Sequence, residues 1–320
     1  MFLDAALIVL ALAVLLVGGD LLVRGAVGAA TALKISPLLV SLTIIAFGTS
    51  APELFVSVTS VIEHQPGIAI GNIIGSNIAN VFLVLGLPAL IYPMSAHVPG
   101  LRRHAVAMLI ATAAFAGVAY GAGSLDRITG AALFAGIILY VVFLAVMARR
   151  TRGRDPVIDE VGGYAEGAGD NLGASSLYII AGLIGLPVGA HLLVDSGSSI
   201  AMELGVRAEL IGLTVVAFGT SLPELATVVA AAFHKKSDVA IGNVVGSNIF
   251  NIFAVGGATG LAGGAAFGEG SLMLDLPVMI AAALALASFI LARRDIGRLA
   301  GLLFVLAYAG FIAVLATQAS

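Results

Sequence analysis

Two stretches of this chain each place one carboxylate among hydroxyl and amide side chains in otherwise apolar sequence. The first reads AFGTSAPE at residues 46–53 and GNIIGSNIAN at residues 71–80. The second reads AFGTSLPE at residues 217–224 and GNVVGSNIFN at residues 242–251. The second stretch repeats the first at an offset of 171 residues, without a gap, so that Glu53 and Glu224 hold equivalent positions. A duplicated motif rich in oxygen atoms predicts a cation site made from two halves.

Each carboxylate follows a proline in the middle of an apolar segment. Pro52 has no N–H to offer to the carbonyl one turn before it, and its ring displaces that carbonyl, so the helix is expected to break here. The break would leave the carbonyls of residues 46–49 without helical partners, next to the hydroxyls of Thr49 and Ser50. Irregular backbone is tolerated at membrane depth only where it lines a cavity or binds something, and hard cations prefer oxygen ligands. The second half repeats this arrangement with Thr220, Ser221 and Pro223.

The second motif adds a polar stripe to the next helix. Asn72, Ser76 and Asn80 are spaced at i, i+4 and i+8, so they share one helix face. Glycines at 71 and 75 form a neighbouring stripe that permits close helix packing. The equivalent polar residues of the second half are Asn243, Ser247 and Asn251. Two interpretations, ion ligand and hydrogen bond between helices, are retained for the amides of Asn72, Asn77, Asn243 and Asn248.

The depth of the two glutamates argues against a purely structural role. A carboxylate at the centre of a bilayer costs roughly 2.5–3.5 kcal/mol on insertion scales, and the predicted spans offer neither Glu53 nor Glu224 a Lys or Arg as partner. Both are therefore expected to be neutralised by bound cations, by protons or by both. Two carboxylates suit one divalent or two monovalent ions. Ca2+ and Na+ accept irregular oxygen shells better than Mg2+, which demands near-ideal octahedral geometry.

The composition shows which elements must position these residues. Hydrophobic residues make up 60% of the chain and charged residues 10%, with a mean hydropathy of +1.12, whereas soluble domains carry about 25% charged residues. Apolar runs of about 18 residues or more recur from end to end, each long enough to cross a bilayer. The chain has no Cys, which excludes disulfides and thiolate metal sites. An all-α membrane protein is therefore predicted, and Asp4 in place of a basic leader favours a retained first span over a signal peptide.

Turn signals divide the chain into ten spans. Their limits are about 3–30, 36–62, 68–92, 103–122, 128–148, 174–201, 209–233, 239–263, 272–292 and 298–317. Residues 149–173 are expected to form a cytoplasmic linker between a first five-helix repeat, residues 1–148, and a second, residues 174–320. Because five is odd, the second repeat enters the membrane from the opposite side. Two inverted repeats with broken helices at the ion site are typical of secondary transporters.

The basic residues support this layout. If the N-terminus lies outside, 13 of the 15 Lys and Arg residues fall on the cytoplasmic side, and only Arg127 and Arg207 remain outside. This is a strong positive-inside bias. It predicts an integral membrane protein with its N-terminus outside and its linker in the cytoplasm.

In both GTSxPE and GSNIxN segments the chain resembles the sodium/calcium exchanger family of the cation/Ca2+ exchanger superfamily. Ten spans and a short linker are similar to the minimal prokaryotic members, which implies a plasma (inner) membrane location. The resemblance implies a secondary active antiporter that exchanges Na+ for Ca2+ by alternating access and moves net charge. Asn at 80 and 251 implies potassium independence. The resemblance further implies no enzyme activity, no cofactor, no nucleic acid and no required protein partner. The expected partners are Ca2+, Na+ and the bilayer, with H+ as a further candidate ion.

The resemblance also implies a role for each residue of the motifs. Glu53 and Glu224 would be shared ligands of Ca2+ and Na+, and the carbonyls of Thr49 and Thr220 would complete the Ca2+ shell. Asn80 and Asn251 would line the centre. Flanking Na+ sites would use the hydroxyls of Ser50, Ser76, Thr220, Ser221 and Ser247 with the carbonyls of Ala46 and Ala217.

Other functions compete with this interpretation. A Ca2+/H+ antiporter on the same fold is the main alternative, although the Thr-Ser pair before each proline favours Na+. A channel is less consistent with an enclosed pair of carboxylates, and the spans show neither a nucleophile–base pair nor a zinc signature for a membrane enzyme. Asp20, His191 and Asp195 each lie near one end of a long span, and they are interpreted as interfacial or interhelical hydrogen-bonding residues, with ion relay as the alternative. His234 is interpreted as a loop or interface residue.

Overall fold

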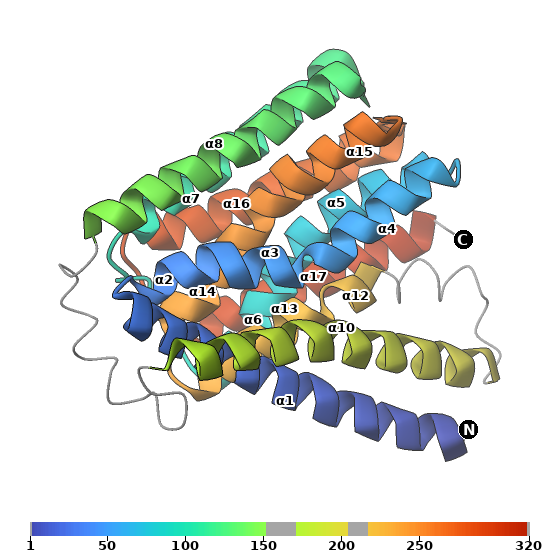
Figure 1. Cartoon of the computed structure of the whole chain (residues 1–320). Helices are drawn as coiled ribbons and strands as arrows, with labels where there is room; N and C mark the ends of the chain where they lie inside the picture. The colour runs from blue at the N-terminus through green and yellow to red at the C-terminus, as the bar shows by residue number, and fades with distance from the viewer. Residues whose placement is uncertain (1, 152–170, 204–216, 319–320) are drawn as a thin grey trace.

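The structure of the protein is a computed structural model, in which residues 2–151, 171–203 and 217–318 are described (Figure 1). Within these ranges the regular elements are helices and one antiparallel ribbon of two short strands, β1 (Ser124–Leu125) and β2 (Ala265–Ala266). Elements labelled η are π-helices. The first half contains α1 (Phe2–Leu33), α2 (Pro37–Val40), η1 (Ser41–Ile45), α3 (Ala46–Thr49), α4 (Ala51–Ile62), α5 (Pro66–Ala79), η2 (Asn80–Leu85), α6 (Gly86–Ile91), α7 (Leu101–Ala122) and α8 (Arg127–Thr151). The second half contains α10 (Leu172–Glu203), α12 (Ala217–Thr220), α13 (Leu222–Phe233), α14 (Ser237–Phe250), η5 (Asn251–Val255), α15 (Gly256–Ala262), η6 (Ser271–Asp275), α16 (Leu276–Leu291) and α17 (Arg298–Gln318).

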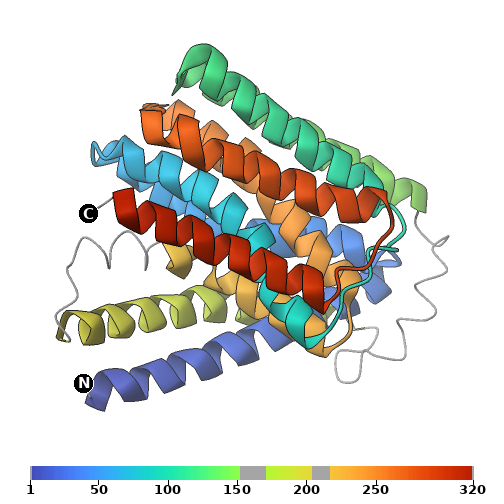
Figure 2. The same ribbon diagram turned by 180° about the vertical axis from the view of Figure 1, so that it is seen from behind.

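In the described residues, 9 helical segments are long and apolar enough to cross a membrane. The seventh predicted span lies partly outside the described residues, and its described part is the short pair α12 and α13. Both chain ends lie at one end of the bundle, whereas α8 ends and α10 begins at the other end (Figures 1 and 2). Each half therefore crosses the bundle an odd number of times. The predicted all-α membrane fold is confirmed, while most of the predicted linker, residues 152–170, lies outside the described part.

The helices α1 and α10 lie side by side at one edge of the bundle in both views (Figures 1 and 2). They approach closely because glycines face the partner helix, and a Cβ on Gly182 would lie 2.7 Å from Leu22 Cβ. Small residues at such a contact let membrane helices pack backbone to backbone. Leu183 of α10 then lies directly over Gly48 of α3. The α1–α10 pair is thus a tightly packed unit that crosses the first broken helix.

The centre of the bundle is α14, which is buried on nearly all sides, whereas α17 lies at the periphery. A Cβ on Gly246 would lie 2.6 Å from Ala46 Cβ, so α14 packs directly on α3 of the other half. Large apolar side chains such as Leu139 and Leu299 are 70% exposed on the outer helices. Apolar side chains around the outside and a buried polar helix at the centre suit a lipid environment.

The predicted helix breaks are present in both halves. α3 ends at Thr49 and α4 begins at Ala51, and the intervening Ser50 has φ −85° and ψ 5°. The break is shorter than predicted, because the Ala46 carbonyl still accepts hydrogen bonds from Ser50 N at 3.1 Å and Thr49 Oγ1 at 3.5 Å. The sequence did not predict the π-helices that begin at Asn80 and Asn251, at equivalent positions of the two halves. Single π-helical turns inside α-helices occur frequently at functional sites.

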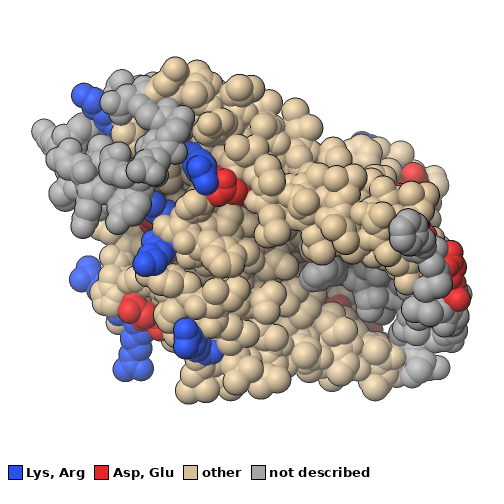
Figure 3. Space-filling view, turned by 90° about the horizontal axis from the view of Figure 1, so that it is seen from below, with Lys and Arg blue, Asp and Glu red and all other residues tan. Residues whose placement is uncertain are grey.

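Charged side chains are concentrated at the ends of the bundle. In the face that Figure 3 shows, most Lys and Arg residues gather toward the end at which α8 ends and α10 begins, and the middle of the face carries few charges. This distribution agrees with the charge asymmetry of the sequence.

Candidate cation site

Glu53 and Glu224 meet in the interior of the bundle. Each lies in the first turn of a half-helix, α4 and α13 respectively, and each is 0% exposed. Ser50, three residues before Glu53, lies within hydrogen-bond distance of the Glu224 carboxylate. The N-termini of both half-helices therefore meet at the site, and the partial positive charge of a helix N-terminus favours negative charge there. No third acidic or histidine side chain of the described residues joins them in a metal-binding group.

Hydroxyl groups of each repeat face the glutamate of the other repeat. Ser50 Oγ donates a hydrogen bond to Glu224 Oε1 at 3.3 Å. The hydroxyl of Thr49 also lies near the Glu224 carboxylate, and the hydroxyl of Thr220 lies near Glu53. Ser247 adds a hydroxyl near the glutamate of its own repeat. The site is thus built across the two halves, as the duplicated motif predicted, and not separately within each half.

Two equivalent hydrogen bonds link the broken helices to the polar stripes of the opposite repeat. Thr49 Oγ1 donates to Asn243 Oδ1 at 3.4 Å, and Thr220 Oγ1 donates to Asn72 Oδ1 at 3.3 Å. Asn72 Nδ2 in turn donates to the backbone carbonyl of Glu53 at 3.0 Å. Asn72 therefore positions the peptide that carries one of the two carboxylates. Of the two interpretations retained for its amide, the geometry favours hydrogen bonding between helices.

Ser57 is a site residue that the sequence motif missed. Its Oγ accepts a second hydrogen bond from Asn72 Nδ2 at 2.8 Å, and it is 0% exposed. The equivalent position of the second repeat is Val228, so this interaction has no counterpart there. No repeated pattern could have indicated it.

The amides of the polar stripes have unequal roles. Asn80 Nδ2 donates to Asn248 Oδ1 at 3.0 Å, and Asn248 Nδ2 donates to the Asn77 carbonyl at 3.4 Å. Asn77 Nδ2 donates to the Ile73 carbonyl within its own helix at 2.7 Å. Asn248 thus holds helices together, while Asn80 and Asn251, both 0% exposed, lie at the start of the two π-helices.

Many buried oxygen atoms of the site lack a hydrogen-bond partner among the described residues. A buried polar atom without a partner costs about 1–3 kcal/mol, so such atoms are rare unless they have a function. The unpartnered oxygens at this place are both carboxylate oxygens of Glu53, Oε2 of Glu224, the hydroxyls of Ser76, Ser221 and Ser247, and Oδ1 of Asn80 and of Asn251. Ca2+ is bound by six to eight carboxylate, carbonyl, amide and water oxygens in flexible geometry. The chemistry of this donor set fits a dehydrated hard cation.

The two predicted alanine carbonyls differ in how far the structure describes them. Ala46 is buried, and its carbonyl already accepts the two hydrogen bonds given above. Ala217 is the first residue of α12, and only its backbone is described.

A cavity of about 210 Å³ reaches the site from one side. It lies between α10 and the broken helices, and Pro52, Val56, Ala190, His191 and Thr220 are among the residues that line it. α10 runs toward the end of the bundle that carries both chain ends (Figure 1). The cavity thus lies beside Thr220, between α10 and the broken helices.

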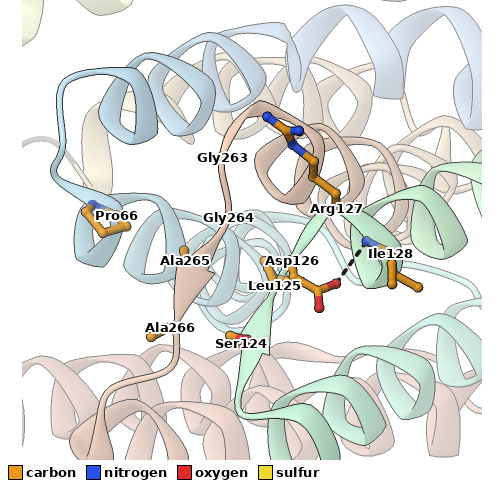
Figure 4. Close-up of a pocket in the computed structure, with 10 residues that line it drawn as sticks. All are labelled: Pro66, Ser124, Leu125, Asp126, Arg127, Ile128, Gly263, Gly264, Ala265 and Ala266. Atoms are coloured by element: carbon orange, nitrogen blue, oxygen red, sulfur yellow. Dashed lines mark hydrogen bonds between the residues drawn. The ribbon is translucent and has the colours of Figure 1, made fainter.

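A larger cavity, about 680 Å³, lies beside the β1–β2 ribbon (Figure 4). None of the predicted site residues lines it. Asp126 at its edge caps α8, since its Oδ1 accepts a hydrogen bond from Ile128 N at 2.9 Å. This cavity belongs to the loops and not to the cation site.

The comparisons with known proteins agree with this geometry. A family model described as sodium/calcium exchanger protein matches residues 3–147 and 174–317. The inner membrane protein YrbG of Escherichia coli is 36% identical over 264 residues, which cover 82% of this chain and 80% of YrbG. The sodium/calcium exchanger MaX1 of Methanosarcina acetivorans is 32% identical over 348 residues, which cover 97% of each chain. A solved structure of the sodium-calcium exchanger NCX_Mj, soaked with 10 mM Na+ and zero Ca2+, is similar with a TM-score of 0.83 and 32% identity over 98% of both chains.

The family match covers most of both halves of the chain, and the similarity to MaX1 and NCX_Mj extends over nearly the whole length. The resemblance and the fold inferred from the two motifs are confirmed, and the class is one of transporters and not of enzymes. This chain belongs to the sodium/calcium exchanger family and is an integral membrane antiporter of that family.

Proposed function

We propose that this protein exchanges Na+ for Ca2+ across the membrane by alternating access, with Glu53 and Glu224 as the ligands for which the two ions compete. The observation that carries the proposal is the set of buried, unpartnered oxygens around two facing carboxylates. The two carboxylates supply a charge of up to −2, which one Ca2+ neutralises. Several Na+ ions can replace that Ca2+ only if neutral oxygens hold them at flanking positions.

The neutral oxygens for this exchange come from both repeats. Hydroxyls of Ser50, Ser76, Thr220, Ser221 and Ser247, with the carbonyls of Ala46 and Ala217, would bind Na+ beside the carboxylates, and the carbonyls of Thr49 and Thr220 would complete the Ca2+ shell. If more than two Na+ replace one Ca2+, transport moves net charge. Asn80 and Asn251 carry no charge, so they add no further cation-attracting carboxylate to the centre, which supports potassium independence.

The orientation follows from the charges. The positive-inside bias of the sequence supports an N-terminus outside and a cytoplasmic linker at residues 149–173, between repeats at residues 1–148 and 174–320. The family matches at residues 3–147 and 174–317 support this division. The relative named inner membrane protein YrbG supports a prokaryotic plasma membrane as the location.

The test is Na+-driven uptake of 45Ca into proteoliposomes at fixed pH, with a protonophore present. Wild-type protein should take up Ca2+ only when a Na+ gradient is imposed. Glu53→Gln and Glu224→Gln should abolish uptake, whereas Glu269→Gln, a matched change at an exposed position outside the predicted site, should leave it unchanged. Retained exchange in both site variants contradicts the assignment of the site. Uptake driven by a pH gradient and not by Na+ would show a Ca2+/H+ antiporter instead, and single-channel currents would show a channel.

A further inference from the structure

Charged residues on α1 and α10 occupy equivalent positions of the two repeats with their charges reversed. Asp20 and Arg24 of α1 correspond to His191 and Asp195 of α10, at the same 171-residue offset that relates Glu53 to Glu224. The same offset relates Glu63, directly after α4, to His234, directly after α13. At the positions equivalent to each other, the first repeat thus has the carboxylates Asp20 and Glu63, and the second repeat has the imidazoles His191 and His234.

One of these two clusters is assembled in the structure. His234 Nε2 lies 2.5 Å from Asp20 Oδ1, and Arg24 Nε lies 2.7 Å from Asp20 Oδ2. The Asp20 and His234 side chains are only 34% and 36% exposed. Next to them α1 lies directly on α13, since a Cβ on Gly19 would come within 2.7 Å of the Ala226 carbonyl oxygen. Asp20 thus ties α1 to the end of α13.

The equivalent cluster on the opposite side is not assembled. His191 Nε2 pairs with Asp195 Oδ2 of its own helix at 3.5 Å, and the two side chains are 76% and 69% exposed. Glu63 is exposed and has no side-chain hydrogen bond or ion pair within the described ranges. The cavity of about 210 Å³ separates α10 from α4 where the first cluster has direct contact. Figures 1 and 2 show α10 and the end of α4 well apart at the end of the bundle that carries both termini.

We propose that Asp20–His234 and His191–Glu63 are two alternating latches, of which the first closes the linker side of the bundle in this conformation and the second closes the opposite side in the other. The inference rests on the proposed alternating access. In an inverted-repeat transporter the second conformation gives each repeat the arrangement that the other repeat has in the first. A shift of the α1–α10 pair then separates Asp20 from His234 and brings His191 to Glu63.

Arg24 and Asp195 are the partners of the latch residues on their own helices. They lie one helical turn beyond Asp20 and His191 and hold them by i,i+4 pairs. His191 with Asp195 shows the released state of a latch, in which the i,i+4 residue remains the only partner. Since the two latches use the same chemical groups, the free energy lost when one opens is offset when the other closes, and both conformations stay accessible.

The test uses single cysteines, because the chain has none of its own. Val56 lines the cavity on the open side, and Thr227, at the equivalent position of the second repeat, is 0% exposed beside Gly19. In purified protein with Ca2+ bound, Val56→Cys should react with a water-soluble thiol reagent faster than Thr227→Cys. Adding Asp20→Asn should raise the reaction rate of Thr227→Cys about five-fold or more and lower that of Val56→Cys, as expected for the loss of one charge-assisted hydrogen bond. Adding Glu63→Gln should move both rates in the opposite directions.

Two controls separate the latch from general loosening of the fold. Lys235→Gln, an exposed change next to His234, should leave both rates unchanged, and the exchanged pair Asp20→His with His234→Asp should restore the wild-type rates. His234→Gln replaces Asp20→Asn if that variant does not fold. Rates that stay constant, or that move in the same direction in Asp20→Asn and Glu63→Gln, overturn the proposal. Thiol labelling needs no ion flux, so the two proposals can fail separately. If the labelling rates shift in opposite directions in a protein that shows no Na+-driven Ca2+ uptake, only the proposed function is refuted. If the labelling rates stay constant in a protein that exchanges the ions, only the latches are refuted.

Discussion

Replacing Asn72 by alanine should destabilise this protein more than any other single change in the polar stripes. The Asn72 amide donates to the Glu53 carbonyl at 3.0 Å and to Ser57 Oγ at 2.8 Å, and its Oδ1 accepts from Thr220 Oγ1 at 3.3 Å. Hydrogen bonds between membrane helices average about 0.6 kcal/mol and reach about 1.7 kcal/mol. Each buried partner left unpaired adds to the loss. The three interactions together correspond to about 2–4 kcal/mol of the free energy of unfolding.

Asn243, the equivalent residue of the second repeat, provides the matched control. It takes part in one longer hydrogen bond, from Thr49 Oγ1 at 3.4 Å, and its Nδ2 has no partner among the described residues. Asn243→Ala should therefore cost about 0.6 kcal/mol. Both side chains are nearly buried, at 6% and 0% exposure, so the volume removed is the same and the difference reports the hydrogen bonds.

The assay is reversible unfolding of the purified protein by increasing mole fraction of sodium dodecyl sulfate, followed by circular dichroism. Ser57→Ala should cost about 1 kcal/mol, and the double variant with Asn72→Ala should show a coupling energy of similar size, because the two residues share one hydrogen bond. Equal losses for Asn72→Ala and Asn243→Ala, or additive effects of Ser57→Ala and Asn72→Ala, would refute the hydrogen-bond argument.

Three further outcomes are expected. Gly182→Ala should lower the free energy of unfolding by about 1–3 kcal/mol through overpacking, because its Cβ would lie 2.7 Å from a leucine of α1. In Gly185→Ala the new Cβ meets nothing closer than 3.9 Å, so this control should leave thermal unfolding unchanged. Backbone N–H groups of the next turn hold the pKa of Asp126 below its usual range. The helix cap that Asp126 provides is therefore fully present above the unfolded pKa of about 3.9 and is lost as pH falls below it. Hydrogen exchange at the start of α8 should become faster at that low pH, and a rate independent of pH after correction for intrinsic exchange would contradict this. Ca2+ at 100 times its Kd should stabilise the wild-type protein by about 2.7 kcal/mol, and Glu224→Gln should lose this stabilisation in a calcium titration of the thermal midpoint.

The repeated motif was sufficient to predict which residues come together, because two inverted copies of one local structure must place equivalent residues about a common centre. Glu53 and Glu224, the hydroxyls of the broken helices and the polar stripes all follow from this symmetry. Ser57 could not be predicted, since the second repeat has valine at its position. The π-helices at Asn80 and Asn251 could not be predicted either, because no residue pattern in the sequence separates an i→i+5 turn from the α-helix around it.

The interaction of Asp20 with His234 shows a second limit of the sequence. Each residue alone had the features of an interface or loop side chain, and 214 residues separate them. Their pairing depends on where α1 lies against α13, which is set by the packing of Gly19 against the Ala226 carbonyl and not by a local signal. Long-range pairs of this kind become visible only once tertiary packing is known.

The two repeats form equivalent hydrogen bonds between the broken helices and the polar stripes, but they pack differently at the edge of the bundle. The hydrogen bonds from Thr49 to Asn243 and from Thr220 to Asn72 have nearly the same length, 3.4 and 3.3 Å. At the edge of the bundle the equivalence fails, because Gly19 lies directly on α13 whereas its counterpart Ala190 faces a cavity. A conformational change that exchanges the arrangements of the two repeats must therefore alter the contacts at the edge of the bundle, and it can leave these two hydrogen bonds as they are. These unequal contacts at the edge involve the α1–α10 pair, so we expect the movement of this pair, and not of the carboxylate centre, to change the side from which the ions have access.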